Sequence, residues 1–535
     1  MNEYIKPKRI ICEKDIINSI HILKSNLNQA VFNDINCIKI KKGGHILLDF
    51  GKELNGGIVL TIQSVSCDNA KIRMVFGESV MESLSDFGKK NAQNNHSIRD
   101  MTVDAVYMST QRFGETGFRF IKLEAINGDI SVRSIQAVND IRNVESLGNF
   151  ECNDELLNEI WKTGVYTVKL NMHEYLWDGV KRDRLVWIGD MHPETSVIKS
   201  VFGNDECVRR SLDLIKNETK GDWMNGIPTY TFWWVIIHYD LYMHWGDIEY
   251  LSEQRDYMID VANKMFHIID ADFKLDNIDG LFVDWSSRGQ DCEIEGVKSI
   301  ACIALKYLKQ MLEIMDEVEC SAKCKVYYDF LKNKKVDDEL ELNNRIAALT
   351  VLAQRSSQKS VDKTLSTTEN EMSCFMGFYI LKALSKMGNN SRALHIIRNY
   401  WGAMLNLGAT TFWEEFNMKW AKNAARIDEI VHDGKDDIHG DFGEHCYKQY
   451  RLSLCHGWAS GPTSFLSENI AGIEILEPGC KKIKICPDLA GLEWVNIDFP
   501  TPYGIVRIEC RCVDDKTNTN VTAPDGVEIV YCQVY

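Results

Sequence analysis

The spacing of the hydrophobic residues changes twice along the chain, and this change limits the folds that it can adopt. From about residue 37 to 140, runs such as "GGIVLTIQSV" and "FRFIKLEAI" alternate apolar and polar side chains, with Gly, Asn and Asp between the runs. This pattern is typical of an antiparallel β-sandwich. Helical spacing follows over about 300 residues, and strand-like runs return after about residue 472.

The helical part indicates two layers of helices. Segments such as "TFWWVIIHYDLYMHW" and "EMSCFMGFYILKALSKMG" are apolar on more than one face, as helices buried inside a domain are. We expect Asn153 to cap the first helix, because Asp154 and Glu155 follow it in the first turn. No fixed repeat is visible, so a regular solenoid is not expected. A closed double ring of helices is the preferred architecture.

A chain of 535 residues is long enough for about three domains. We predict a multidomain α and β protein. Its parts are an N-terminal antiparallel β-sandwich over residues 1–148, a helical barrel over 149–472, and a small C-terminal β-sandwich domain over 473–535.

The net charge narrows the range of partners. A formal charge of −16 without a long basic run argues against a nucleic acid or an anionic membrane as the main partner. The first residues lack the apolar core of a secretory signal, and no stretch has the roughly 18 apolar residues of a membrane helix. The 17 scattered cysteines do not look like a disulfide framework. We therefore expect a cytoplasmic protein with free thiols and a neutral or positively charged ligand.

Three segments place carboxylates beside tryptophans, as a sugar site requires. Carboxylates bind hydroxyl groups or transfer protons, and indole rings stack on the apolar side of a sugar. On spacing alone, the alternative remains that the charges pair at a domain boundary and the tryptophans belong to the core. The residues concerned are Asp178, Asp183 and Asp190 near Trp187, then Asp284 next to Trp285, and Glu414 and Glu415 after Trp413.

The runs "DGVKRDRLVWIGDMHPE", "GATTFWEEF" and "SLCHGWASGP" resemble, in this order, three landmark segments of the α-L-rhamnosidases of glycoside hydrolase family 78. Flanking runs such as "LLDFGKELNGGIVLTI" and "PGCKKIKICPDLAGLEW" resemble the β domains of that family. The resemblance implies an (α/α)6 barrel as the catalytic domain, between β-sandwiches. It also implies hydrolysis of terminal α-L-rhamnosides with inversion at the anomeric carbon, by a reaction that requires no metal or cofactor.

The first motif departs from the common family form, Asp-Cys-Pro-x-Arg-Asp-Glu-Arg-Leu-Gly-Trp, in which the Glu is the general acid. The segment "DGVKRDRLVW" is one residue shorter. An alignment on Arg184 and Trp187 places Asp183 at the acid position, whereas an alignment on Asp178 leaves no acid. The first alignment is preferred because its matching part is ungapped. Since Asp is one methylene shorter than Glu, the backbone must then approach the glycosidic oxygen more closely.

The resemblance assigns roles to the remaining residues. Asp183 protonates the leaving oxygen, which requires a pKa raised by burial or by neighbouring carboxylates. Glu414 activates water, with Glu415 as the alternative base, and an inverting pair should lie roughly 6.5 to 9.5 Å apart. Arg182 is expected to orient the carboxylates. The substrate-binding set comprises Asp178, Arg182, Trp187, Asp190, Asp284, Trp285, Trp413 and His456.

Two other classes of function remain open. Another inverting glycosidase or a glycoside phosphorylase on the same barrel would share the acid, and a phosphorylase would replace the base by a phosphate pocket. A rhamnose-binding protein without activity is the non-enzymatic alternative, because the acid motif is shortened. The expected partner is a small rhamnoside, and a homodimer is the expected assembly.

Overall fold

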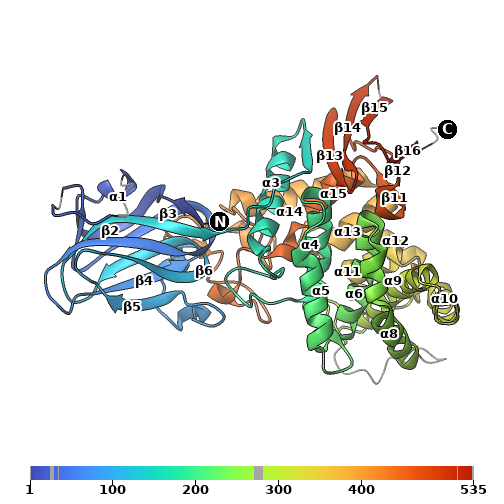
Figure 1. Ribbon diagram of the computed structural model, residues 1–535, viewed down its shortest axis with the longest axis horizontal. Coiled ribbons are helices and arrows are strands. Elements are labelled where there is room, and N and C mark those ends of the chain that lie inside the picture. Colours follow the sequence, from blue (N-terminus) through green and yellow to red (C-terminus); the bar gives the residue numbers. More distant parts are fainter. Residues whose placement is uncertain (1, 25–28, 34, 270–280, 515, 533–535) are drawn as a thin grey trace.

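The computed structural model describes residues 2–24, 29–33, 35–269, 281–514 and 516–532. A β domain lies at one end of the molecule, helices form the other end, and a smaller group of strands packs on the helices (Figure 1).

The β domain is one seven-stranded sheet in which every strand pair is antiparallel. Its longest strand, β3, pairs with β2, β6 and β7, and alternate side chains of these strands enclose an apolar core. The predicted antiparallel β architecture is thus confirmed. The elements are β1 (Asn2–Ile5), β2 (Arg9–Ile17), α1 (His21–Lys24), β3 (Ile38–Val65), β4 (Lys71–Gly77), α2 (Val80–Leu84), β5 (Asp100–Asp104), β6 (Ser109–Ala125) and β7 (Ile130–Asp140).

The helices alternate between an inner and an outer ring in the described part of the chain. Each inner helix contacts the next, and the last contacts the first, which closes the ring. This arrangement confirms the predicted (α/α)6 barrel. The inner helices are α4 (Ile188–Val201), α6 (Pro228–Trp245), α9 (Glu293–Ile314), α11 (Asn344–Leu352), α13 (Cys374–Lys386) and α15 (Gly461–Asn469). The outer helices are α3 (Glu155–Asn171), α5 (Glu206–Glu218), α7 (Ile248–Glu253), α8 (Arg255–Ile268), α10 (Val318–Asn333), α12 (Gln358–Leu365) and α14 (Asn390–Asn406).

Sequence pattern decides which ring a helix joins. The inner helix α6 is buried on nearly all sides, as its almost continuous apolar sequence predicts. The outer helix α5 buries one stripe, formed by Cys207, Val208, Ser211 and Leu212, and exposes charged residues elsewhere. The stripe has the i, i+1, i+4, i+5 spacing of a helix that packs on one side only.

The first helix begins one residue later than expected. Asp154 is the N-cap of α3, because its Oδ1 accepts hydrogen bonds from the N–H groups of Leu156 (3.0 Å) and Leu157 (3.2 Å). The prediction that Asn153 caps this helix is wrong. Its Oδ1 instead accepts a hydrogen bond from the N–H of Glu493 at 3.0 Å, and so connects the start of α3 to the C-terminal strands.

The C-terminal strands form two small sheets above α3 and α15 (Figure 1). One sheet includes β8, which precedes α3 in sequence, so the residues at the predicted start of the barrel contribute a strand to the C-terminal part. Apolar residues of these strands join the core of the barrel. The first sheet has the order β15 (Lys516–Thr522), β14 (Gly504–Val513), β13 (Trp494–Thr501) and β8 (Asn149–Cys152), and the second β11 (Ile473–Glu477), β12 (Lys482–Ile485) and β16 (Glu528–Tyr531).

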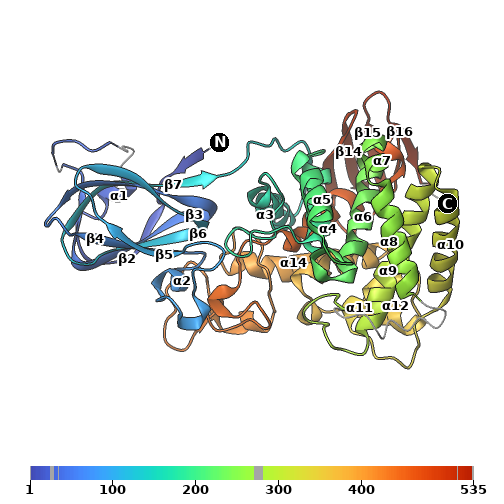
Figure 2. The same ribbon diagram turned by 60° about the horizontal axis from the view of Figure 1, so that its bottom comes forward.

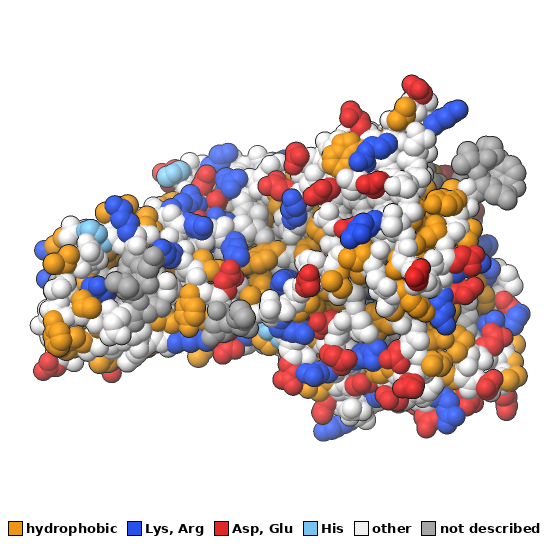
Figure 3. Space-filling model, turned by 45° about the horizontal axis from the view of Figure 1, so that its top comes forward, with side chains coloured by type: hydrophobic (Ala, Val, Ile, Leu, Met, Phe, Trp, Pro, Cys, Tyr) orange, Lys and Arg blue, Asp and Glu red, His pale blue; other side chains and the backbone are white. Residues whose placement is uncertain are grey.

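Acidic and basic side chains are interspersed on the face that Figure 3 shows. This face has no continuous basic surface of the kind that attracts a nucleic acid. Among the helices in the described ranges, none is long and apolar enough to span a lipid bilayer.

The crossing of α3 and α15 provides a test of the packing. Gly164 lies so close to α15 that an added Cβ atom would overlap Oγ1 of Thr463. We expect Gly164→Ala to lower the free energy of unfolding by about 1–3 kcal/mol, since overpacking outweighs the gain in helix propensity. Gly221→Ala is the control, because its Cβ would meet no atom within 4 Å. Thermal unfolding of both variants measures the difference, and equal midpoints would contradict the close approach.

Candidate active site

A cavity of about 410 Å3 lies at the end of the barrel where the inner helices begin. Its walls come from segments 178–190, 225–230, 281–288 and 446–458, which precede or begin α4, α6, α9 and α15, and from Glu414. Helix N-termini carry a partial positive charge and favour negatively charged groups. This end of the barrel is therefore suited to a cluster of carboxylates.

Asp183 and Glu414, the predicted acid and base, meet at one guanidinium group. Nη1 of Arg182 donates a hydrogen bond to Oδ1 of Asp183 at 3.1 Å, and Nη2 donates to Oε1 of Glu414. The backbone N–H of Ser453 donates to the other oxygen of Glu414 at 3.0 Å. The Glu414 side chain is 2% exposed and that of Asp183 is 17% exposed. The two carboxyl groups thus lie on either side of Arg182 in the cavity wall.

The backbone at the predicted acid is in an unusual conformation. Asp183 (φ 59°) and Arg184 (φ 52°) are consecutive residues in the left-handed region. This conformation costs roughly 1–2 kcal/mol for each residue that is not glycine. The turn is closed by Leu185, whose N–H donates to Oδ1 of Asp178 at 2.9 Å and whose carbonyl accepts from the N–H of Asp178 at 3.1 Å.

Asp178 has a pKa raised to about 8, and burial is the main cause. The nearby charges of Asp183 and Asp190 raise this pKa further, and His456 lowers it. Asp178 is therefore mainly protonated at pH 7 and can donate a hydrogen bond. Asp190 accepts hydrogen bonds from the hydroxyl of Tyr230 at 3.1 Å and, at 3.2 Å, from Nε2 of His456.

Aromatic rings form much of the remaining wall. Trp187 meets Tyr230 edge to face, with ring centroids 6.2 Å apart, and Trp285 meets Tyr447 in the same way at 6.3 Å. Trp458 closes the wall near Glu414, because its Nε1 donates to the Glu414 carbonyl at 2.9 Å. Such a surface can stack on the apolar face of a sugar ring.

Eight of the ten predicted site residues line the cavity, and the other two lie behind its wall. The eight are Asp178, Arg182, Asp183, Trp187, Asp190, Trp285, Glu414 and His456. Asp284 instead accepts hydrogen bonds from Ser286 (2.6 Å) and Ser373 (3.2 Å), and so holds the loop that carries Trp285. Trp413 is 1% exposed and packs in the core against Phe416. Both support the wall rather than face the cavity.

Sequence analysis missed several wall residues. Trp458 stands two positions after His456 in the motif "SLCHGW", so the motif itself contained the signal. Tyr230 lies in a helix that is apolar throughout, and no pattern distinguishes it from core aromatic residues. Other wall residues that were not predicted include Asn225, Arg288, Tyr447 and Arg451.

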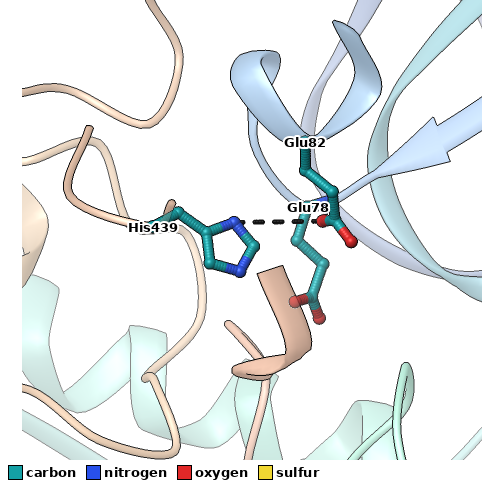
Figure 4. Close-up of side chains that lie close together, drawn as sticks. All are labelled: Glu78, Glu82 and His439. Carbon is teal, nitrogen blue, oxygen red and sulfur yellow. Dashed lines mark hydrogen bonds and ion pairs between the residues drawn. The ribbon is translucent and has the colours of Figure 1, made fainter. Parts of the chain in front are cut away.

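A buried cluster next to the cavity joins the barrel to the β domain. Glu78 and Glu82, at α2, and His439, in the segment between α14 and α15, place three possible metal ligands within 4.8 Å of one another (Figure 4). Figure 2 shows this orange segment beside α2. Nζ of Lys181 lies among them, 2.9 Å from Oε2 of Glu78, 3.3 Å from Oε1 of Glu82 and 3.5 Å from Nε2 of His439. It also donates to two backbone carbonyls, those of Tyr450 and Leu452.

The cluster is suited to an ammonium group rather than to a metal ion. Burial raises the pKa of Glu78 to about 7, although Lys181 opposes the rise. Burial also acts to raise the pKa of Glu82, but Lys181, His439 and Arg99 outweigh it and lower that pKa. Burial lowers the pKa of His439 to about 3, so its ring is neutral. Lys181 thus supplies positive charge where a metal ion would otherwise bind.

Two parts of the chain match domain families of known proteins. Residues 145–326 match the six-hairpin glycosidase domain of bacterial α-L-rhamnosidases, and residues 472–532 match the C-terminal domain of the same proteins. Over these two ranges the chain is similar to bacterial α-L-rhamnosidases. These two matches cover most of the barrel's first half and the C-terminal strands.

Individual relatives are distant in sequence. An α-L-rhamnosidase of Formosa agariphila is 20% identical over 91% of this chain, which spans 55% of that protein. The crystal structure of a family 78 rhamnosidase from Bacillus sp. GL1 has a TM-score of 0.76 at 20% identity, over 96% of this chain and 55% of the Bacillus chain. A Klebsiella oxytoca rhamnosidase with rhamnose bound has a TM-score of 0.66 at 19% identity, over 87% of this chain and 95% of that chain. The chain therefore spans about half the length of the curated relatives.

The Lys181 cluster generates a stability prediction. Lys181→Met removes the cation and leaves Glu78 and Glu82 buried together, which we expect to cost about 3–5 kcal/mol of unfolding free energy. The control is Lys325→Met, whose partner Asp329 is exposed, and this variant should unfold as the wild type does. Thermal unfolding compares the three proteins. A Lys181 variant as stable as the control would show that the cluster does not depend on this charge.

Proposed function

We propose that the protein is an inverting α-L-rhamnosidase that releases terminal α-L-rhamnose from small rhamnosides. The observation that carries the proposal is the meeting of Asp183 and Glu414 at Arg182. Their cavity lies in a barrel whose residues 145–326 match the glycosidase domain of bacterial α-L-rhamnosidases. A cavity of about 410 Å3 suits one or two sugar rings rather than a polymer.

The two carboxyl groups divide the reaction between them. Asp183 gives its proton to the glycosidic oxygen as the bond from this oxygen to the anomeric carbon breaks. A water molecule on the opposite face forms a new bond to the anomeric carbon and gives a proton to Glu414. The products are β-L-rhamnose and the free alcohol, and exchange with solvent restores both carboxyl groups. Arg182 binds both carboxyl groups and would fix their positions relative to each other.

The rest of the cavity would hold the sugar. Asp178, mainly protonated because of its raised pKa, would donate to one hydroxyl, and Asp190 would accept from another. Trp187 and Trp285 would contact the apolar parts of the ring, including the C6 methyl group.

The primary test is an assay on an aryl α-L-rhamnoside with the product anomer followed by NMR. Wild type should release β-L-rhamnose first. Asp183→Asn and Glu414→Gln should each lose about 10²–10⁴-fold in kcat. With α-L-rhamnosyl fluoride, whose leaving group needs no proton, Asp183→Asn should regain activity and Glu414→Gln should not. Glu415→Gln is the matched control, since Glu415 does not line the cavity and should be dispensable. Initial release of α-L-rhamnose would refute inversion.

The raised pKa makes Asp178 a second candidate for the acid, and one substitution separates the two roles. If Asp178 binds the sugar as a neutral group, Asp178→Asn preserves a neutral donor and should reduce kcat by less than about 10-fold. If Asp178 is the acid, the same variant should lose about 10²–10⁴-fold and recover on the fluoride. The second result would move the acid role from Asp183 to Asp178.

A further inference from the structure

The β domain reaches the predicted acid directly. His96 lies in the segment between α2 and β5, and its Nε2 is 3.2 Å from Oδ1 of Asp183. The His96 side chain is 31% exposed, so it contacts Asp183 from a partly solvent-exposed position rather than from a core. Among the residues described, it is the β-domain side chain that pairs with the carboxyl group of Asp183.

Other contacts join the β domain to the same loop. Gly117 in β6 approaches so closely that an added Cβ atom would lie 2.7 Å from the Val180 side chain. Hydrogen bonds also join the β domain to residues 180–184. The N–H of Gly117 donates to the Val180 carbonyl (3.1 Å), and Oγ of Ser97 donates to the Lys181 carbonyl (2.7 Å). In the other direction, Nη1 of Arg184 donates to the Glu115 carbonyl (3.2 Å). The β domain thus contacts the loop that carries Asp183 at several positions between Val180 and Arg184.

Backbone conformation indicates that these contacts hold an otherwise unfavourable geometry. His96 (φ 67°) is left-handed, like Asp183 and Arg184 across from it. Residues other than glycine rarely adopt this region, and they remain there only where surrounding contacts determine the conformation. The backbone conformations at His96 and at Asp183 are therefore both fixed by the contacts around them.

We propose that His96 is a positioning residue for the general acid, so that the β domain completes the active site; this inference rests on the proposed function. As a donor, Nε2–H of His96 occupies Oδ1 of Asp183 and leaves Oδ2 to carry the proton toward the glycosidic oxygen. Arg182 contacts the same carboxyl group, the charge of Arg451 acts on it, and Asp178 is a further titratable group beside it. The short side chain of Asp183, whose Oδ1 both His96 and Arg182 contact, is thereby held in one orientation.

The test compares variants that keep the left-handed backbone. His96→Asn tolerates this conformation but is too short to reach Asp183, whereas His96→Gln can restore a donor near the Nε2 position. His45→Asn is the matched control, because His45 is a partly buried histidine of β3 in the same domain. Each variant, checked for folding by circular dichroism, is assayed on 4-nitrophenyl and methyl α-L-rhamnosides, whose leaving groups need little and much protonation respectively.

A positioning role affects the two substrates unequally. We expect His96→Asn to lower kcat about 10-fold or more on the methyl rhamnoside and less than about 3-fold on the nitrophenyl rhamnoside, with KM unchanged and partial rescue by His96→Gln. The alkaline limb of the pH–rate profile should also move to higher pH, because a lost donor no longer favours the charged carboxylate. Equal losses on both substrates, or none, would overturn the inference. No turnover by the wild type would instead overturn the proposed function, and the inference with it.

Discussion

One buried ammonium group connects the parts of the candidate active site. Nζ of Lys181 lies among carboxylates from the β domain and carbonyls from the segment before α15, and the next residue, Arg182, holds both predicted catalytic carboxylates. Glu78, a partner of Lys181, also accepts a hydrogen bond from the N–H of Leu454 at 2.7 Å, beside the segment that binds Glu414. A shift of Lys181 would therefore displace the predicted acid and the predicted base together. The β domain thus takes part in shaping the candidate site.

The barrel explains why so many carboxyl groups can share one cavity. The wall segments precede inner helices, whose N-termini favour negative charge. Arg182 and Arg451 supply further compensation in the wall. Where positive charge does not compensate for the burial of a carboxyl group, that group stays protonated, as the raised pKa of Asp178 indicates. The result is one site with both a proton donor and charged groups at pH 7.

The sequence allowed the architecture and most of the cavity wall to be predicted, because periodicity reports burial and motifs report local chemistry. It could not show which neighbour in a motif faces inward. Asp284 and Trp285 are adjacent, yet one supports the loop and the other lines the cavity. Contacts across domains were equally invisible, since His96 lies in a segment without a recognisable motif. The error at Asn153 has the same origin, because its side chain bonds to Glu493, just before β13 and more than 300 residues later in the chain.

The geometry of the loop gives a physical account of the shortened motif. Asp178 and Leu185 close the segment by two hydrogen bonds, and the left-handed pair at Asp183 and Arg184 turns the chain within it. Two consecutive left-handed residues reverse the direction of the chain in fewer residues than an extended turn does. The loop can therefore close although it is one residue shorter than the common family motif. The same turn places the Asp183 carboxyl in the cavity wall although its side chain is a methylene shorter than Glu. If Asp183 is the acid, the shorter loop and the shorter side chain form one structural change, as the alignment that anchors on Arg184 and Trp187 predicts.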